Sequence, residues 1–265
     1  MKLCEQEFVP LQEKLRRRKP KDAFLRFFSR KYAGYYHFGK LSDQTRTVLA
    51  HTISTADGRL VYVKNSKAGC SAVAHLLYQY DNGRVYEGDI HDAPIRKMTE
   101  KWRSLDDIPE STLSFSTVRN PEWRSVSAFF NFFVDKQNPQ AARHQNRIEL
   151  FGFSRKADHH YQFDVFLDYI EANFAHSAFR TDRHFRPQHI NLGHGSIELS
   201  YISRLETLAA DLKRISDQAG VTLPSVDRLA ESKKNKSSSA DFLPSSAQKH
   251  RIEKIYSKDY ELYGY

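Results

Sequence analysis

The sequence is poor in cysteine and has no long hydrophobic run, and both absences exclude classes of protein. Cys4 and Cys70 are the only cysteines among the 265 residues, too few for a disulfide framework or a cysteine metal site. No stretch approaches about eighteen consecutive apolar residues, and none near the N-terminus has the apolar centre of a signal peptide. The sequence therefore predicts neither a disulfide-rich scaffold nor a membrane-spanning protein.

The composition is that of a folded, basic protein. Hydrophobic residues make up 40% of the chain and aromatic residues 13%, which argues against disorder. The formal net charge of +9 favours polyanionic partners, namely a nucleotide, an acidic glycan, nucleic acid or a membrane surface. We expect a basic helical extension over residues 1–47, a single domain over residues 48–265, and a mobile loop at about residues 232–244.

The stretch from Leu60 to Tyr80 predicts a strand, a loop and a helix, because an apolar run is followed by apolar residues at helical spacing. The loop reads Lys64-Asn65-Ser66-Lys67-Ala68-Gly69-Cys70-Ser71. Its small side chains leave the N–H groups at the helix start uncovered, which favours an anion, and Lys67 would add positive charge there. The loop lacks the standard Gly-Lys-Ser/Thr ending of phosphate loops, so an ordinary turn with exposed lysines remains an alternative.

A second stretch, residues 113–129, predicts a strand that runs into a capped helix. Asn120 is a good N-cap and Pro121 a good first helical residue. Arg119 then stands at the carboxyl end of the strand, and Ser127 lies about two turns into the helix, so the chain can bring both to one anion. For either residue alone, an ion pair or simple packing is the plainer interpretation.

Local patterns predict further elements. Val48–Ile53 and Leu60–Val63 flank the turn signal Ala56-Asp57-Gly58 and are expected to form a hairpin. Ile197–Ile202 is expected to be a strand and Arg204–Ala219 a helix. The polar stretch 135–160 is expected to be either an exposed connection or a flap that binds an acceptor.

Together, the two anion-binding stretches resemble the sulfotransferases that use 3′-phosphoadenosine 5′-phosphosulfate (PAPS), in particular the carbohydrate branch known as sulfotransferase family 2. The loop is similar to the family's Pro-Lys-x-Gly-x-Ser/Thr loop, with Ser66 where proline is usual. The residues that match the family's 3′-phosphate motif are Arg119, Asn120, Pro121, Arg124, Ser127 and Phe129. Residues 182–188 and 256–265 resemble two further family segments, so the resemblance covers roughly residues 50–265.

The resemblance implies an α/β fold with a central parallel sheet flanked by helices, and a P-loop-like strand-loop-helix that binds PAPS. Lys67 and the loop N–H groups would hold the 5′-phosphosulfate, while Arg119 and Ser127 would hold the 3′-phosphate. Arg124 would assist, or would only pair with an acid. The cofactor-binding residues that we expect are Lys67, Ala68, Gly69, Cys70, Ser71, Ala72, Arg119, Arg124 and Ser127.

Sulfuryl transfer to an alcohol needs a base that takes the hydroxyl proton, and a histidine suits this task near neutral pH. By resemblance, His184 faces the acceptor, with Asp182 as its orienting partner and Gln188 as a hydrogen-bonding neighbour. A structural Asp–His pair that locks a turn is the alternative. His91 is a second candidate base, because some relatives place a histidine between the two cofactor motifs, although a surface histidine is the plainer interpretation.

The expected reaction is an in-line transfer through a loose transition state, in which Lys67 stabilises charge on the leaving phosphate. We expect no metal, because His159 and His160 have no further ligands at suitable spacing. The expected acceptor is a hydroxyl of a carbohydrate or glycolipid, and an acidic saccharide would suit the basic, tyrosine-rich surface. The basic N-terminal cluster would meet a membrane surface, an anionic acceptor or only solvent.

Golgi relatives carry a transmembrane anchor, and its absence from this sequence leads us to expect a cytoplasmic protein. Two alternative functions remain. A nucleotide-dependent kinase would also use a basic strand-loop-helix, but it needs a magnesium site that the sequence does not suggest. A noncatalytic protein that binds nucleic acid or glycans would account for the positive charge, but no nucleic-acid-binding motif is evident and we expect no nucleic-acid partner.

Overall fold

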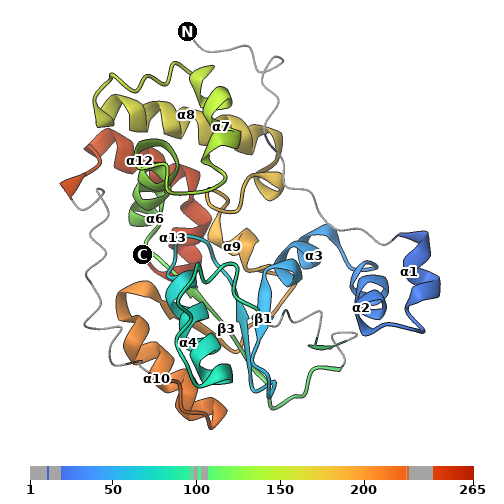
Figure 1. The fold of residues 1–265 in the computed structure, drawn as a ribbon. Coiled ribbons are helices and arrows are strands. Elements are labelled where there is room, and N and C mark those ends of the chain that lie inside the picture. The colour runs from blue at the N-terminus through green and yellow to red at the C-terminus, as the bar shows by residue number, and fades with distance from the viewer. Residues whose placement is uncertain are drawn as a thin grey trace. The chain divides into compact units, whose positions relative to one another are not determined.

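The computed structural model describes residues 11, 19–95, 97, 101–102, 107–224, 226 and 241–265 (Figure 1). Most of the expected mobile loop and the basic residues 14–18 lie outside this part of the chain. In chain order the elements are α1 (Pro20–Leu25), α2 (Arg30–Phe38), α3 (Asp43–Ala50), β1 (Thr52–Ser54), β2 (Leu60–Val63), α4 (Cys70–Asn82), β3 (Leu113–Val118), α6 (Pro121–Phe129), the π-helical turn η2 (Phe130–Val134), α7 (Ala141–Glu149), α8 (His159–Ser177), η3 (Ala178–Arg180), α9 (Gln188–Asn191), β4 (Tyr201–Arg204), η4 (Leu205–Thr207), α10 (Leu208–Ala219), α12 (Ser246–Ile255) and α13 (Ser257–Tyr263).

The four strands form one sheet in the order β1-β2-β3-β4. β1 pairs antiparallel with β2, whereas the β2–β3 and β3–β4 pairs are parallel. Val63 of β2 is level with Ser116 of β3, so both strands end at the same edge of the sheet. All four residues of β2 are buried, as expected for a parallel strand that is covered on both faces. The predicted α/β fold with a largely parallel sheet flanked by helices is confirmed.

Two predicted strand boundaries are wrong, although both strands exist. Val48 belongs to α3, because Ser42 caps this helix by accepting a hydrogen bond from the N–H of Thr45. The hairpin itself is present, with its first strand starting at Thr52. The fourth strand starts later than predicted, because its pairing with β3 begins at Tyr201.

The chain divides into two compact units. The described residues within 14–118 and 190–234 form a sheet unit, and those within 1–13, 119–189 and 235–265 form a helical unit. The predicted separation of a basic extension at residue 47 stays a prediction. The core of the sheet unit joins apolar residues of the strands to those of α4 and α10, among them Leu60, Tyr62, Leu77, Phe115 and Leu212.

The core of the helical unit is built largely from phenylalanine. Phe129, Phe130, Phe132 and Phe133 are each at most 2% exposed, so the end of α6 and the η2 turn are buried almost all round. Their rings pack against the phenylalanines of α8 and against Phe185. Phe185, in the segment that follows η3, belongs to this core and ties that segment to η2 and α8.

Candidate functional site

In the sheet unit, the predicted strand, loop and helix are present as β2, residues 64–69 and α4. The loop turns tightly, with the N–H of Ala68 donating to the carbonyl of Asn65 at 3.3 Å. Lys67 has a φ of 65° and Gly69 a φ of 80°, so two left-handed residues lead into the helix. Because the first N–H groups of a helix have no partner within it, the start of α4 offers an anion site beside the partly exposed Lys67.

A buried amide that the sequence did not single out holds this loop against the sheet. Asn65 is completely buried, and its Nδ2 donates to the carbonyl of Thr117 in β3 at 2.9 Å. Its Oδ1 accepts a hydrogen bond from Nδ2 of Asn191 at 3.2 Å. The loop is therefore anchored at its beginning to the neighbouring parallel strand, close to the point where that strand ends.

Glycine is favoured at position 69 for two reasons: its backbone is left-handed, and a Cβ atom there would be too close to a neighbouring side chain. A Cβ at this position would lie 2.7 Å from Cδ1 of Leu205. We expect Gly69→Ala to lower the free energy of unfolding by at least about 1–2 kcal/mol, the cost of a left-handed alanine. Gly83→Ala is the matched control in urea unfolding, because Gly83 ends the same helix with a φ of 68° and no atom of the described residues lies within 4 Å of its Cβ position. Equal losses in the two variants would contradict the close contact at residue 69.

The structure brings His91, the alternative base, to the first turn of α4. Nε2 of His91 lies 3.1 Å from Oγ of Ser71, and both residues are exposed. The N–H of His91 donates to Oδ1 of Asp89 at 2.9 Å, which orients the histidine backbone. His91 thus contacts Ser71, which lies twenty positions earlier and is one of the residues expected to bind the cofactor.

In the helical unit, α6 begins as predicted. Oδ1 of Asn120 accepts hydrogen bonds from the N–H groups of Glu122 and Trp123, and Pro121 is the first helical residue. Ser127 lies in the second turn of this helix and is half-buried. The local capping signals were therefore sufficient to place Arg119 immediately before the helix.

Gln188, expected as a hydrogen-bonding neighbour of His184, holds the backbone of Arg119 through both ends of its side-chain amide. Its Oε1 accepts from the N–H of Arg119 at 3.0 Å, and its Nε2 donates to the carbonyl of Arg119 at 2.8 Å. The N–H of Gln188 in turn donates to Oδ2 of Asp259 at 2.7 Å. Gln188 and Asp259 are both completely buried, so the backbone of Arg119 is fixed by a dry polar clamp.

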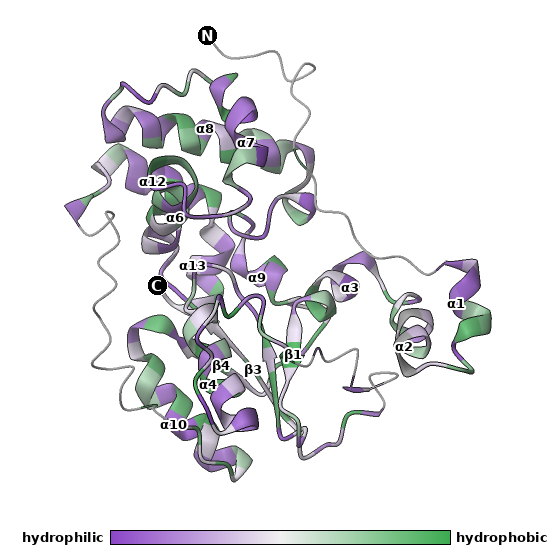
Figure 2. Ribbon diagram, in the orientation of Figure 1, coloured by the Kyte–Doolittle hydropathy of each residue, from purple (hydrophilic) through white to green (hydrophobic). Residues whose placement is uncertain are grey.

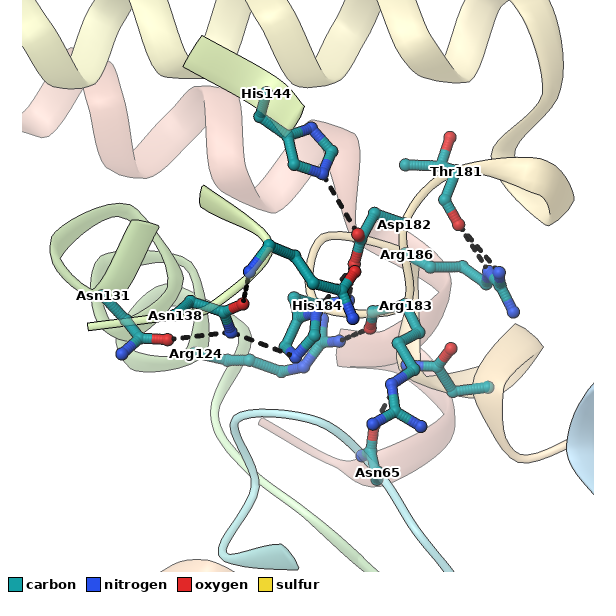
Figure 3. Close-up of polar contacts among 12 residues, drawn as sticks. Asn65, Arg124, Asn131, Asn138, His144, Thr181, Asp182, Arg183, His184 and Arg186 are labelled. Carbon is teal, nitrogen blue, oxygen red and sulfur yellow. Dashed lines mark hydrogen bonds and ion pairs between the residues drawn. The ribbon is translucent and has the colours of Figure 1, made fainter. Parts of the chain in front are cut away.

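Arg124 lies in the interior and is only 2% exposed. Its Nη2 donates to the carbonyl of Arg183 at 3.0 Å, which supports the turn between Asp182 and Gln188 (Figure 3). Nearby, the guanidinium of Arg186 donates to the carbonyl of Thr181 through Nε and Nη2. Burial therefore favours a structural role for Arg124 over the predicted contact with the cofactor.

Asp182 lies between two histidines, of which the sequence analysis identified only one (Figure 3). Its Oδ1 is 2.7 Å from Nδ1 of His184, and its Oδ2 is 3.1 Å from Nε2 of His144. Nδ1 of His144 is 2.7 Å from the hydroxyl of Tyr169. His144 falls in the stretch expected to be an exposed connection or flap, yet it is 1% exposed and sits on the inner face of α7.

The chain of contacts determines which nitrogens carry protons. Burial alone raises the pKa of Asp182, but the hydrogen bonds from His144 and His184 outweigh it and hold this pKa well below its ordinary value. The ionised carboxylate accepts from Nδ1–H of His184 and Nε2–H of His144, and burial raises the pKa of Tyr169, which therefore donates its hydroxyl proton to Nδ1 of His144. In this assignment Nε2 of His184 carries a lone pair, as a general base requires.

The surroundings of His184 keep its ring in place and restrict water. The ring of Phe132 lies 5.0 Å from that of His184 and 5.5 Å from that of His144, measured between centroids. Nδ2 of Asn138 is 3.5 Å from Nε2 of His184, so an amide stands beside the basic nitrogen. The side chain of His184 remains 11% exposed, which leaves a route to a hydroxyl group.

Across the residues that the structure describes, no group of three His, Cys, Asp or Glu side chains gathers to hold a metal ion. In the same part of the chain, none of the helices combines the length and apolar character that crossing a membrane needs.

A sequence model of the sulfotransferase family matches residues 50–265. The match includes the β2–α4 loop, the start of α6 and the Asp182–Gln188 segment, whereas α1 and α2 lie outside it. No curated protein and no solved structure matches the chain.

Proposed function

Because the chain belongs to the sulfotransferase family, we propose that it transfers the sulfuryl group of PAPS to a hydroxyl of a carbohydrate or glycolipid. Membership of the family establishes sulfuryl transfer in general. The proposal concerns the identity of the donor and of the acceptor. The observation that carries it is the β2–α4 loop, in which a lysine lies beside the N-terminus of a helix at the carboxyl edge of two parallel strands.

The loop suits the 5′-phosphosulfate. The loop leads into the N-terminus of α4, where the helix dipole favours negative charge, and Lys67 supplies a full charge. The small residues Gly69, Cys70, Ser71 and Ala72 leave little side chain over the start of the helix, whereas Ala68 is buried and its N–H is bonded to the carbonyl of Asn65. As the bond between sulfur and the bridging phosphate oxygen breaks, the negative charge left on that oxygen would be stabilised here.

Arg119 and Ser127 suit the 3′-phosphate. The Gln188 clamp holds the backbone of Arg119, so its guanidinium is presented from a fixed base. A planar guanidinium makes paired, charge-assisted hydrogen bonds to phosphate, and a serine hydroxyl adds a further donor.

His184 suits the role of base. Its Nε2 would take the proton of the acceptor hydroxyl as the new sulfur–oxygen bond forms, leaving adenosine 3′,5′-bisphosphate and the sulfated acceptor as products. Asp182 would stabilise the resulting imidazolium through Nδ1. His91 is the second candidate because of its contact with Ser71 at the start of α4.

The acceptor is proposed from the composition of the chain. The chain is basic overall, with a net charge of +9, and rich in tyrosine, with 14 residues of this type. Tyrosine rings and cationic side chains bind sugar faces and acidic substituents. A saccharide acceptor fits these residues, and a sugar attached to a lipid would fit equally.

The test is calorimetric titration of adenosine 3′,5′-bisphosphate into the wild type and Arg119→Ala in metal-free buffer. We expect the substitution to weaken binding roughly 10- to 150-fold, the value of a hydrogen bond to a charged group. Arg155→Ala is the matched control, because Arg155 is exposed in the same unit and its loss changes the net charge equally.

The outcomes separate the alternatives. Binding that is unchanged by Mg²⁺ and sensitive to Arg119→Ala supports the proposal. Binding that requires Mg²⁺ would favour a kinase, and the absence of binding by the folded wild type would overturn PAPS as donor. Equal weakening by Arg119→Ala and Arg155→Ala would indicate a diffuse charge effect that falls steeply with salt, as expected for a noncatalytic polyanion-binding protein.

A further inference from the structure

The turn after α1 carries a cluster of exposed aromatic side chains. Phe24, Phe27 and Phe28 are 66%, 70% and 75% exposed, and the rings of Phe24 and Phe28 lie 5.4 Å apart. The other large hydrophobic residues that the structure shows exposed are scattered singly along the described chain. Three phenylalanines within five residues therefore form the one concentrated apolar surface among them.

This cluster is displayed by an ordered piece of structure. Pro20 begins α1, and the completely buried Asp22 accepts a hydrogen bond from the N–H of Lys19 at 2.7 Å. The guanidinium of Arg26 stacks over the ring of Tyr36 in α2 at 4.0 Å and over the ring of Phe27 at 4.6 Å. Figure 2 shows the apolar residues of α1 between hydrophilic ones. The phenylalanine rings thus point outward from a helical hairpin whose polar contacts are already made.

The positive charge of the protein is concentrated around this cluster. In the sequence, residues 14–40 contain ten lysines and arginines and a single acid, so their net charge equals the +9 of the whole chain. The remaining residues contain 31 basic and 31 acidic residues and are neutral overall. Among the described residues, Lys19 and Lys21 are exposed and lie immediately before the phenylalanines.

The phenylalanines and the basic residues 14–40 lie outside the family match, which begins at residue 50. We infer that the α1 segment, residues 19–29, docks the protein on an anionic lipid surface. The phenylalanine rings would enter the boundary between head groups and acyl chains, and the lysines would meet the phosphates of the head groups. This inference is independent of the identity of the donor and acceptor.

Two other occupants fit less well. A second copy of the chain would bring two strongly positive segments together, and their repulsion opposes association. Nucleic acid would satisfy the charge, but its phosphate backbone would leave the apolar surface of Phe24, Phe27 and Phe28 exposed to water. A lipid surface satisfies the charge and the apolar rings together.

The experiment is co-sedimentation of the full chain with vesicles of phosphatidylcholine alone and of phosphatidylcholine mixed with phosphatidylglycerol. We expect binding only to the anionic vesicles, weakened by salt because part of it is electrostatic. The variant with Phe24→Ser, Phe27→Ser and Phe28→Ser should bind about tenfold more weakly or worse. The variant with Lys19→Gln and Lys21→Gln should bind the anionic vesicles more weakly than the wild type, and its binding should depend less on salt.

The matched control carries Val85→Ser, Leu150→Ser and Leu243→Ser, which remove three exposed apolar side chains elsewhere. It should bind vesicles as the wild type does. Circular dichroism melting of all variants verifies that they are folded. No binding to anionic vesicles, or equal binding of these vesicles by the phenylalanine variant, would overturn the inference.

Insertion of the turn into the bilayer can be measured by the quenching of tryptophan fluorescence in a Phe27→Trp variant bound to vesicles of brominated lipids. The wild type has two tryptophans, and its fluorescence is subtracted. Quenching of the added tryptophan is expected if the turn enters the bilayer boundary. Absence of quenching in vesicle-bound protein would show that only the charge binds and would overturn the role of the phenylalanines.

Discussion

Replacing Lys67 by methionine is expected to slow sulfuryl transfer about 100- to 1000-fold, or roughly 2.7–4 kcal/mol of barrier, if the lysine acts as one preorganised donor to the leaving oxygen. Methionine keeps an unbranched stem of similar length and removes only the charge. Because Lys67 already has a φ of 65°, the variant has the same backbone requirement and should unfold at the same urea concentration. The change should therefore affect the rate and not the fold.

The measurement is the single-turnover release of adenosine 3′,5′-bisphosphate from bound PAPS in the presence of acceptor. Lys213→Met is the control, because Lys213 is exposed on α10 in the same unit and its loss changes the net charge equally. A Lys67→Met enzyme with the rate of the wild type would remove this residue from the leaving-group site. A loss confined to the affinity for PAPS would show that Lys67 binds the ground state and transition state equally.

The second large effect is expected at His184, where asparagine should lower kcat about 100- to 10,000-fold, the range for loss of a general base. Asparagine can still donate one hydrogen bond to Asp182 in place of Nδ1–H, but it has no counterpart of Nε2. The wild-type rate should fall with acidification as Nε2 is protonated, whereas the residual rate of the variant should lack this dependence. Rate against pH for both enzymes is the measurement.

His91→Asn distinguishes the two candidate bases. If His184 is the base, this variant should keep the acid limb of the pH profile and most of the rate. If His91→Asn abolishes the rate and the pH dependence while His184→Asn keeps them, the roles are reversed and Asp182–His184 is a structural pair.

Two substitutions of the buried His144 distinguish a role in positioning Asp182 from a role in packing alone. Its Nε2–H occupies one oxygen of Asp182, which leaves the other for His184. Glutamine at residue 144 can still donate to Asp182, while leucine fills similar space without a donor. Activity retained by His144→Gln and lost by His144→Leu, with both variants folded, is the pattern expected if His144 orients Asp182. Equal activity of the two would contradict it.

The sequence alone determined the features that depend on neighbours along the chain. The apolar run before the lysine loop predicted β2, and Asn120-Pro121 predicted the start of α6. Family membership was also readable, because its motifs are short and ordered. These signals are local: caps, periodicities and turn residues act over three or four positions, so the chain states them directly. Local patterns also gave one wrong prediction, because they placed Val48 in a strand and it lies in α3.

Only the tertiary structure decided which polar groups meet. His144 and Asp182 are 38 positions apart, and Gln188 and Arg119 are 69 apart. A buried histidine or glutamine looks like an exposed one in sequence, because its partner comes from a distant segment of the chain. Arg124 shows the same limit, since neither its burial nor its hydrogen bond to the carbonyl of Arg183 is visible in the motif. Long-range pairing follows from how the apolar faces of helices pack, and no local pattern encodes that arrangement.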